Sequence, residues 1–148
     1  MTLDITRVAR MNATTLLRLC CALALSAHVQ AHADVVIIVN AATTAQIDED
    51  YAAKIFLRQV KAFADGSPTA PMNQKDGPLT DEFRSRVLKK NTAQFKSYWA
   101  QQLFTGAAKP VPEVDGDDAV LKHVAETPGG IGYVEAGKTR AGVRVIKK

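Results

Sequence analysis

The segment 73–80, which reads NQKDGPLT, has the residue types needed to hold a small anion. The pair Asp76-Gly77 predicts a turn, and Pro78 suits the first position of a helix. Free backbone N–H groups at a helix N-terminus are a natural seat for an oxyanion. Lys75 could add a positive charge and Thr80 a hydroxyl. The same residues are equally explained by a turn and helix start without any ligand, and this simpler interpretation is the one the residues alone favour.

A second set of polar residues follows the first predicted strand. Asn40, Thr43 and Thr44 lie in a short loop, at the position where α/β folds commonly place ligand contacts. Polar residues are also what any surface loop contains. We therefore add this set to the predicted anion site.

The chain offers few residues for catalysis or metal binding. His123 is the single histidine after residue 33, and both cysteines precede that point. A Ser-His or Cys-His arrangement would have to use His123, which lies near the edge of a helix's apolar stripe. The run 115–118, which reads DGDD, lacks the alternating ligands of a calcium loop, and carboxylates that cap the next helix explain it better. We therefore predict no enzyme, no metal site and no cofactor.

The first 33 residues have the plan of a secretory signal peptide. Basic residues at Arg7, Arg10 and Arg18 precede an apolar run over 19–27, and a small-x-small site ends at Ala33. The run is too short to span a membrane. Cleavage after Ala33 predicts a periplasmic domain over 34–148 that does not span the membrane.

Two variants of this N-terminal interpretation stay open. Met11 could be the true start of the chain. Cys20 or Cys21 could carry a lipid anchor, although Leu19 stands where lipoprotein signals place a small residue.

The charge of the predicted domain is nearly balanced. The whole chain has a formal net charge of +4, and removing the signal peptide lowers it to +2. This argues against a nucleic-acid-binding protein. The cluster Arg84, Arg86, Lys89 and Lys90 is typical of a solvated helix face.

Hydrophobic patterns predict an α/β fold with a mixed sheet and about four helices. The run 34–39 is apolar and β-branched, as in a strand that is covered on both faces. Short strands are also predicted over 131–134 and 143–146. Some connections are too short for crossover helices, so the sheet should be mixed.

The four predicted helices have readable boundaries and apolar stripes. The first follows acidic residues at 48–50, and the second carries its stripe through Phe83. The third begins with a capping box at Asn91, ends near Gly106 and has the stripe Phe95, Trp99 and Leu103. The fourth spans about 117–126.

Three motifs together resemble the periplasmic phosphate-binding protein of phosphate ABC transporters. These are the AKIFL helix at 53–57, the Asp76-Gly77 turn and the segment 127–134, TPGGIGYV. The resemblance covers 34–148 and implies a single lobe of a periplasmic-binding-protein-like fold. It further implies phosphate or another small oxyanion as the ligand and an ABC permease as the partner.

The same resemblance implies a role for each residue of the turn. Lys75 would supply charge, Asp76 would accept a hydrogen bond from a protonated ligand oxygen, Gly77 would donate its amide, and Thr80 its hydroxyl and amide. The family's loop typically reads Arg-Ser-Asp-Gly-Ser-Gly-Thr.

This chain departs from the family's loop at three positions. Gln74 replaces the arginine, Pro78 removes an amide and a hydroxyl, and Leu79 replaces a glycine. These changes predict weaker anion binding, at a loss of about 1.5–3 kcal/mol for each charge-assisted bond. The alternative function is a ligand-free interaction or sensory module of the cell envelope. Pairing of two copies to rebuild a cleft is a further hypothesis.

Overall fold

The computed structural model describes residues 34–146. The predicted signal peptide, its cleavage after Ala33, the start at Met11 and the anchors at Cys20 and Cys21 lie outside these residues. Within 34–146, no helix combines the length and the apolar character needed to cross a membrane.

A mixed sheet of four strands forms the centre of the domain, as predicted. Its order is β2 (Ala70–Pro71), β5 (Gly130–Glu135), β1 (Val35–Asn40) and β6 (Val143–Val145). β1 runs antiparallel to both of its neighbours, whereas β2 runs parallel to β5. A separate parallel pair of strands is formed by β3 (Asn73–Gln74), which comes directly after β2, and β4 (Glu113–Val114), which comes after α4.

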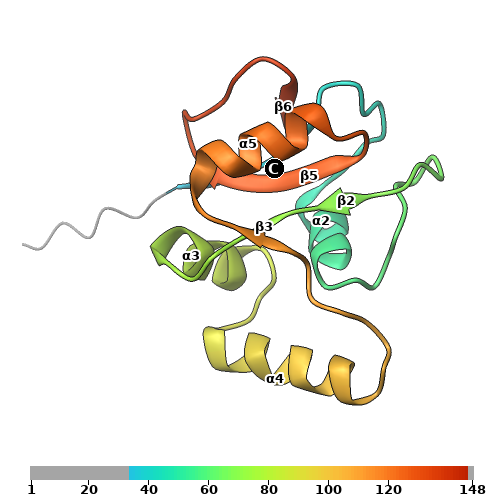
Figure 1. The fold of residues 1–148 in the computed structure, drawn as a ribbon, viewed down its shortest axis with the longest axis vertical. Helices are drawn as coiled ribbons and strands as arrows, with labels where there is room; N and C mark the ends of the chain where they lie inside the picture. The colour runs from blue at the N-terminus through green and yellow to red at the C-terminus, as the bar shows by residue number, and fades with distance from the viewer. Residues whose placement is uncertain (1–33, 147–148) are drawn as a thin grey trace, which may run out of the picture. The chain divides into compact units, whose positions relative to one another are not determined.

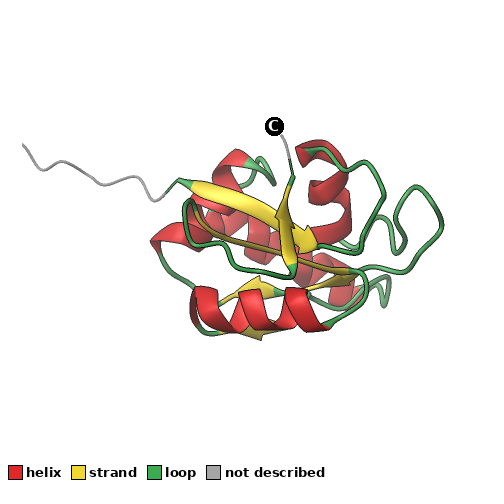
Figure 2. Ribbon diagram, turned by 90° about the horizontal axis from the view of Figure 1, so that it is seen from above, coloured by secondary structure: helices red, strands yellow, loops and turns green. Residues whose placement is uncertain are grey.

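Helices cover both faces of the sheet (Figures 1 and 2). α5 (Gly116–Glu126) packs Val120 and Val124 against Ile38 of β1 and Val134 of β5. The opposite face of β1 joins a larger cluster with α2 (Glu49–Phe56), α3 (Pro78–Arg86) and α4 (Thr92–Phe104). The expectation that the first strand is covered on both faces is confirmed, because its residues alternate between these two clusters.

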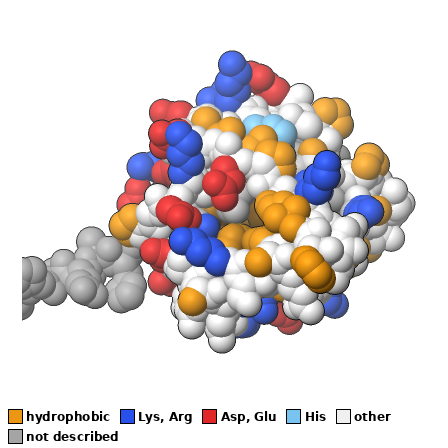
Figure 3. Space-filling view, turned by 60° about the horizontal axis from the view of Figure 1, so that its bottom comes forward, with side chains coloured by type: hydrophobic (Ala, Val, Ile, Leu, Met, Phe, Trp, Pro, Cys, Tyr) orange, Lys and Arg blue, Asp and Glu red, His pale blue; other side chains and the backbone are white. Residues whose placement is uncertain are grey.

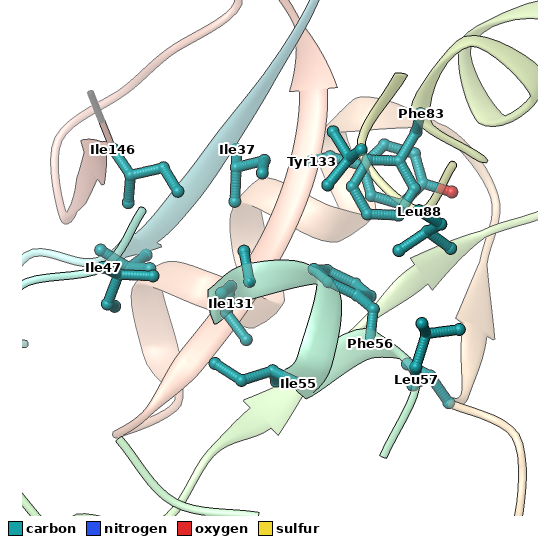
Figure 4. Close-up of a cluster of buried hydrophobic side chains, with 14 of the residues drawn as sticks. Ile37, Ile47, Ile55, Phe56, Leu57, Phe83, Leu88, Ile131, Tyr133 and Ile146 are labelled. Carbon is teal, nitrogen blue, oxygen red and sulfur yellow. The ribbon is translucent and has the colours of Figure 1, made fainter. Parts of the chain in front are cut away.

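An aromatic group forms part of the larger cluster (Figure 4). The rings of Phe83 and Tyr133 stack with centroids 3.9 Å apart and an interplanar angle of 7°. Phe56 meets both rings edge-on, at centroid distances of 4.8 and 5.9 Å. These contacts join α2, α3 and β5.

The Tyr133 hydroxyl connects this core to the segment that follows β2. It donates to Asn73 Oδ1 at 2.6 Å, accepts from the backbone N–H of Gln74 at 3.1 Å, and lies 3.1 Å from Thr80 Oγ1. Burial raises the pKa of the Tyr133 phenol above its usual value, so the hydroxyl stays protonated and able to donate. One side chain of β5 thereby holds both β3 and the first turn of α3.

The helix starts largely agree with the sequence patterns. Asp48 caps α2 by accepting from the Tyr51 N–H at 2.7 Å, and Asn91 and Gln94 form the predicted capping box of α4. The prediction that 115–118 caps α5 with carboxylates is wrong, since Asp115 occupies the cap position without a side-chain cap bond.

The predicted apolar stripe of the third helix is correct at two of three positions. Phe95 and Trp99 are buried, but the Leu103 side chain is 53% exposed and its neighbour Phe104 is 93% exposed. The last turn of α4 therefore leaves these two apolar side chains largely in contact with solvent.

Gly129, in the turn between α5 and β5, is expected to tolerate no larger residue. Its φ is +75°, and a Cβ there would lie 2.1 Å from the carbonyl oxygen of Pro68. Gly129→Ala should lower the free energy of unfolding by about 2–4 kcal/mol, because positive φ and a backbone clash add. Gly106→Ala is the matched control, because φ is +69° but nothing lies within 4 Å. Urea unfolding that gives equal losses for both variants would contradict the packing at Gly129.

Tyr133→Phe tests the hydroxyl connection, since it keeps the ring stack and removes only the oxygen. We expect a loss of about 1–3 kcal/mol, because buried partners at Asn73 and Gln74 lose their bonds. Tyr98→Phe removes a single bond, to the Leu57 carbonyl oxygen, and serves as the comparison. A smaller loss for Tyr133→Phe than for Tyr98→Phe, measured by thermal and urea unfolding, would refute the proposed importance of this hydroxyl.

Candidate functional site

The start of α3 leaves several backbone donors without partners. The chain leaves β3 at Gln74 and enters the helix at Pro78. Between them, the backbone N–H of Lys75 donates a hydrogen bond to the Val114 carbonyl oxygen at 3.0 Å. Among the described residues, the N–H groups of Gly77, Leu79 and Thr80 donate to no acceptor. Such amides at the positive end of a helix dipole can bind an anion.

A hollow of about 340 Å³ lies at this helix start, and it also borders the start of α5. Its lining comes from β3, the starts of α3 and α5, the end of β5 and the loop after it, through Gln74, Pro78, Leu79, Gly116, Asp117, Glu135 and Lys138. Two helix N-termini therefore face one hollow. Each contributes positive partial charge there.

The chain's own carboxylates lie in the same hollow. Asp117 Oδ1 accepts from Gln74 Nε2 at 2.8 Å, and Asp117 Oδ2 pairs with Lys138 Nζ at 3.2 Å. Lys138 also pairs with Glu135 at 2.8 Å. The hydrogen bond to Glu135, followed by the one to Asp117, raises the pKa of the Lys138 amine. The side chains lining the hollow carry two negative charges against one positive.

The side chains predicted to contact an anion already have partners within the chain. The Thr80 residue is 1% exposed, and its hydroxyl donates to the Lys75 carbonyl at 2.8 Å. Asp76 Oδ1 accepts from Arg84 Nη2 at 2.7 Å. Lys75 Nζ lies 3.4 Å from Asp115, with both side chains largely exposed. What remains open at the turn is chiefly backbone.

The interpretation of the basic cluster as a solvated helix face is wrong for Arg84. This side chain is 3% exposed, and its guanidinium carbon lies 4.4 Å from the centroid of the Phe95 ring. Arg86 is also mostly buried, with its guanidinium paired to Asp34 and Glu49. Both arginine side chains contact neighbouring segments of the chain, and the sequence pattern did not reveal these contacts.

The second predicted set lies elsewhere. Asn40 Nδ2 donates to the carbonyls of Val124 and Ala125 at the C-terminal end of α5. Asn40, Thr43 and Thr44 line a separate hollow of about 230 Å³. The α3 start borders the opposite end of α5, a helix of 11 residues and therefore about 15 Å long. The structure thus does not bring the two sets together.

Sequence reasoning missed Asp117, Glu135 and Lys138 as residues beside the candidate anion site. They come from α5, β5 and the following loop, and no spacing in the sequence signals that they meet Gln74. Arg84 did carry a signal, because it follows Asp81 by three residues and therefore shares a helix face with it. Within 34–146, no group of three or more His, Asp or Glu residues could hold a metal ion.

The Asp76–Arg84 pair should make folding stability depend on pH. The hydrogen bond from Arg84, followed by its charge, lowers the pKa of the Asp76 carboxyl from 3.8. The stabilisation is therefore present above pH 3.8 and is lost as the pH falls through the lower folded-state pKa. Asp76→Asn should be less stable than the unmodified chain at neutral pH, and this difference should shrink in acid.

Urea unfolding as a function of pH measures this difference. Asp50→Asn is the control, since Asp50 is exposed and has no ion pair among the described residues. A difference between Asp76→Asn and the unmodified chain that stays constant below pH 3.8 would count against the pair.

Comparison with solved structures gives the fold a context. The chain is similar to a protein from Clostridium perfringens described as a phosphate ABC transporter substrate-binding protein with bound phosphate, at 12% identity and a TM-score of 0.59. It is also similar to PstS from Borrelia burgdorferi, at 16% identity and 0.56, and to a protein from Planctomyces limnophilus described as a phosphate binding protein, at 12% and 0.55. No protein-family model and no curated protein matches the sequence.

These alignments cover 76% of this chain but only 44%, 46% and 40% of the respective proteins. The chain therefore spans less than half the length of the structures it matches. At such identities the likeness establishes the fold alone. The described domain is a single lobe of a periplasmic-binding-protein-like fold.

Proposed function

We propose that this chain is a periplasmic solute-binding component that captures phosphate or another small oxyanion for an ABC permease. The observation that carries the proposal is the pair of unpaired N–H groups of Gly77 and Leu79 at the start of α3. Lys75 adds charge beside this turn, and Asp76 offers an acceptor to a protonated ligand. The proposed localisation rests on the signal peptide predicted over 1–33, and the proposed permease on the likeness in fold.

The site that supports this proposal is a half-site. It has helix amides and lysines, but Gln74 occupies the position where the resembled family has an arginine. Asp117 and Glu135 in the same hollow repel an anion. We therefore expect phosphate binding by the isolated domain to be weak. A second lobe or a partner protein would have to complete the cavity, which agrees with a chain spanning less than half of its structural neighbours.

Asp117→Asn tests the site directly. It removes the negative charge between the two helix starts, keeps an oxygen to accept from Gln74, and releases Lys138 from one of its two carboxylates. We expect phosphate to bind about threefold to tenfold more tightly than to the unmodified domain, consistent with the energy of a partly screened charge. Calorimetric titration of phosphate-free protein gives the measurement.

Asp118→Asn is the matched control, because it removes an exposed carboxylate from the next position of the same helix. It should leave the affinity unchanged. If neither the unmodified domain nor Asp117→Asn binds phosphate at millimolar concentration, the oxyanion proposal is lost.

A specific observation favours a second candidate, the interaction or sensory module without a ligand. Asp76 and Thr80 already have partners within the fold, and Phe104 and Leu103 are exposed on α4. Photo-crosslinking from Phe104 in intact cells, with Ala93 as the comparison position on the same helix, would test it. A defined envelope partner captured from position 104 together with absent phosphate binding would favour the module.

A further inference from the structure

A second hollow, of about 380 Å³, lies between α3, α4 and the β3–β4 pair. Figure 3 shows hydrophobic side chains gathered around a hollow on the face that α4 helps to form. The apolar part of its lining comes from Phe95, Trp99, Ala100, Leu103 and Pro110. Its size and composition are those of a site for a small organic molecule.

Two side chains that line this hollow carry buried donors without hydrogen-bond partners among the described residues. These donors are Arg84 Nε and Nη1 and the indole Nε1 of Trp99. Arg84 Nη1 lies 3.5 Å from Asp81 Oδ1, but without the geometry of a hydrogen bond. Buried donors in folded proteins are nearly always paired, so unpaired ones at a hollow indicate a missing acceptor.

The charges around the hollow suit a ligand with one acidic group. Arg84 and Lys96 oppose Asp76 and Glu113, so the lining side chains have no net charge and do not repel an anion as the other hollow does. Nη2 of Arg84 already donates to Asp76, whereas Nε and Nη1 each keep an N–H that can donate to a carboxylate oxygen. The aromatic and aliphatic residues of the lining would hold an apolar body.

We propose that this hollow is a binding site for a small organic acid with an aromatic or branched apolar body. The carboxylate faces Arg84 and Lys96, a small rotation of Arg84 or Trp99 brings the buried donors to its oxygens, and the apolar body lies between Trp99 and Leu103. The site shares Asp76 with the proposed oxyanion contacts but no lining residue with the hollow at the helix starts, and it adds a second ligand class to the domain.

Trp99 provides the readout, because it is the one tryptophan of the chain. Titration of the whole domain over 34–148 with phenylacetate should give a saturable change in Trp99 emission, in the millimolar range or tighter for a fragment of this size. Phenylacetamide has the same shape without the charge and should bind at least about fivefold more weakly. Equal binding of the two would overturn the carboxylate assignment, and absence of any saturable change would overturn the site.

Variants locate the binding without disturbing buried groups. Ala100→Phe fills the hollow from an exposed position of α4 and should weaken phenylacetate binding at least about tenfold. Ala93→Phe, exposed on the same helix but outside the hollow, should have no effect. Lys96→Gln should weaken binding about twofold to fivefold, whereas Lys122→Gln on α5 should not.

Inorganic phosphate separates this proposal from the previous one. Phosphate should not displace phenylacetate, because the two hollows have different linings. Competitive displacement, or equal losses from Ala100→Phe and Ala93→Phe, would refute a separate organic-acid site. Failure of phosphate binding alone would leave the phenylacetate result unaffected.

Discussion

The position of the candidate anion site depends on one buried phenol. The Tyr133 ring stacks on Phe83 of α3, while its hydroxyl bonds to Asn73 and to the backbone of Gln74. Since Tyr133 is part of the central sheet, these contacts hold the β3 segment and the first turn of α3 against it. An unpaired hydroxyl at this depth would be costly, so the segment has little freedom to move away.

This arrangement explains why the site consists mainly of backbone. Thr80 lies in the core, where its hydroxyl contacts the Tyr133 hydroxyl, and Asp76 accepts a hydrogen bond from the buried Arg84. Both side chains stabilise the turn, so they are less available to a ligand. The amides at the start of α3 have no such internal partner, and a helix N-terminus can bind an anion through them alone.

One of the described hollows lies on each side of the β3–β4 pair, and these two hollows differ in polarity and charge. The one at the helix starts is polar and carries excess negative charge from side chains, offset by two helix dipoles. The one against α4 is mostly apolar, with balanced charges and buried unpaired donors. A domain that spans less than half the length of its structural neighbours thus has two chemically distinct hollows.

The sequence by itself determined the elements of this fold. Apolar runs, capping residues and turn signals predicted β1, the four helices and the mixed sheet, because these features depend on neighbours a few residues apart. Only the tertiary structure decided the partners of Arg84, the meeting of Gln74 with Asp117 and Lys138, and the separation of Asn40 from Lys75 by the length of α5. Except for the contacts of Arg84 with Asp76 and Asp81, those contacts join segments that are distant in the chain, and local patterns carry no information about which of them meet.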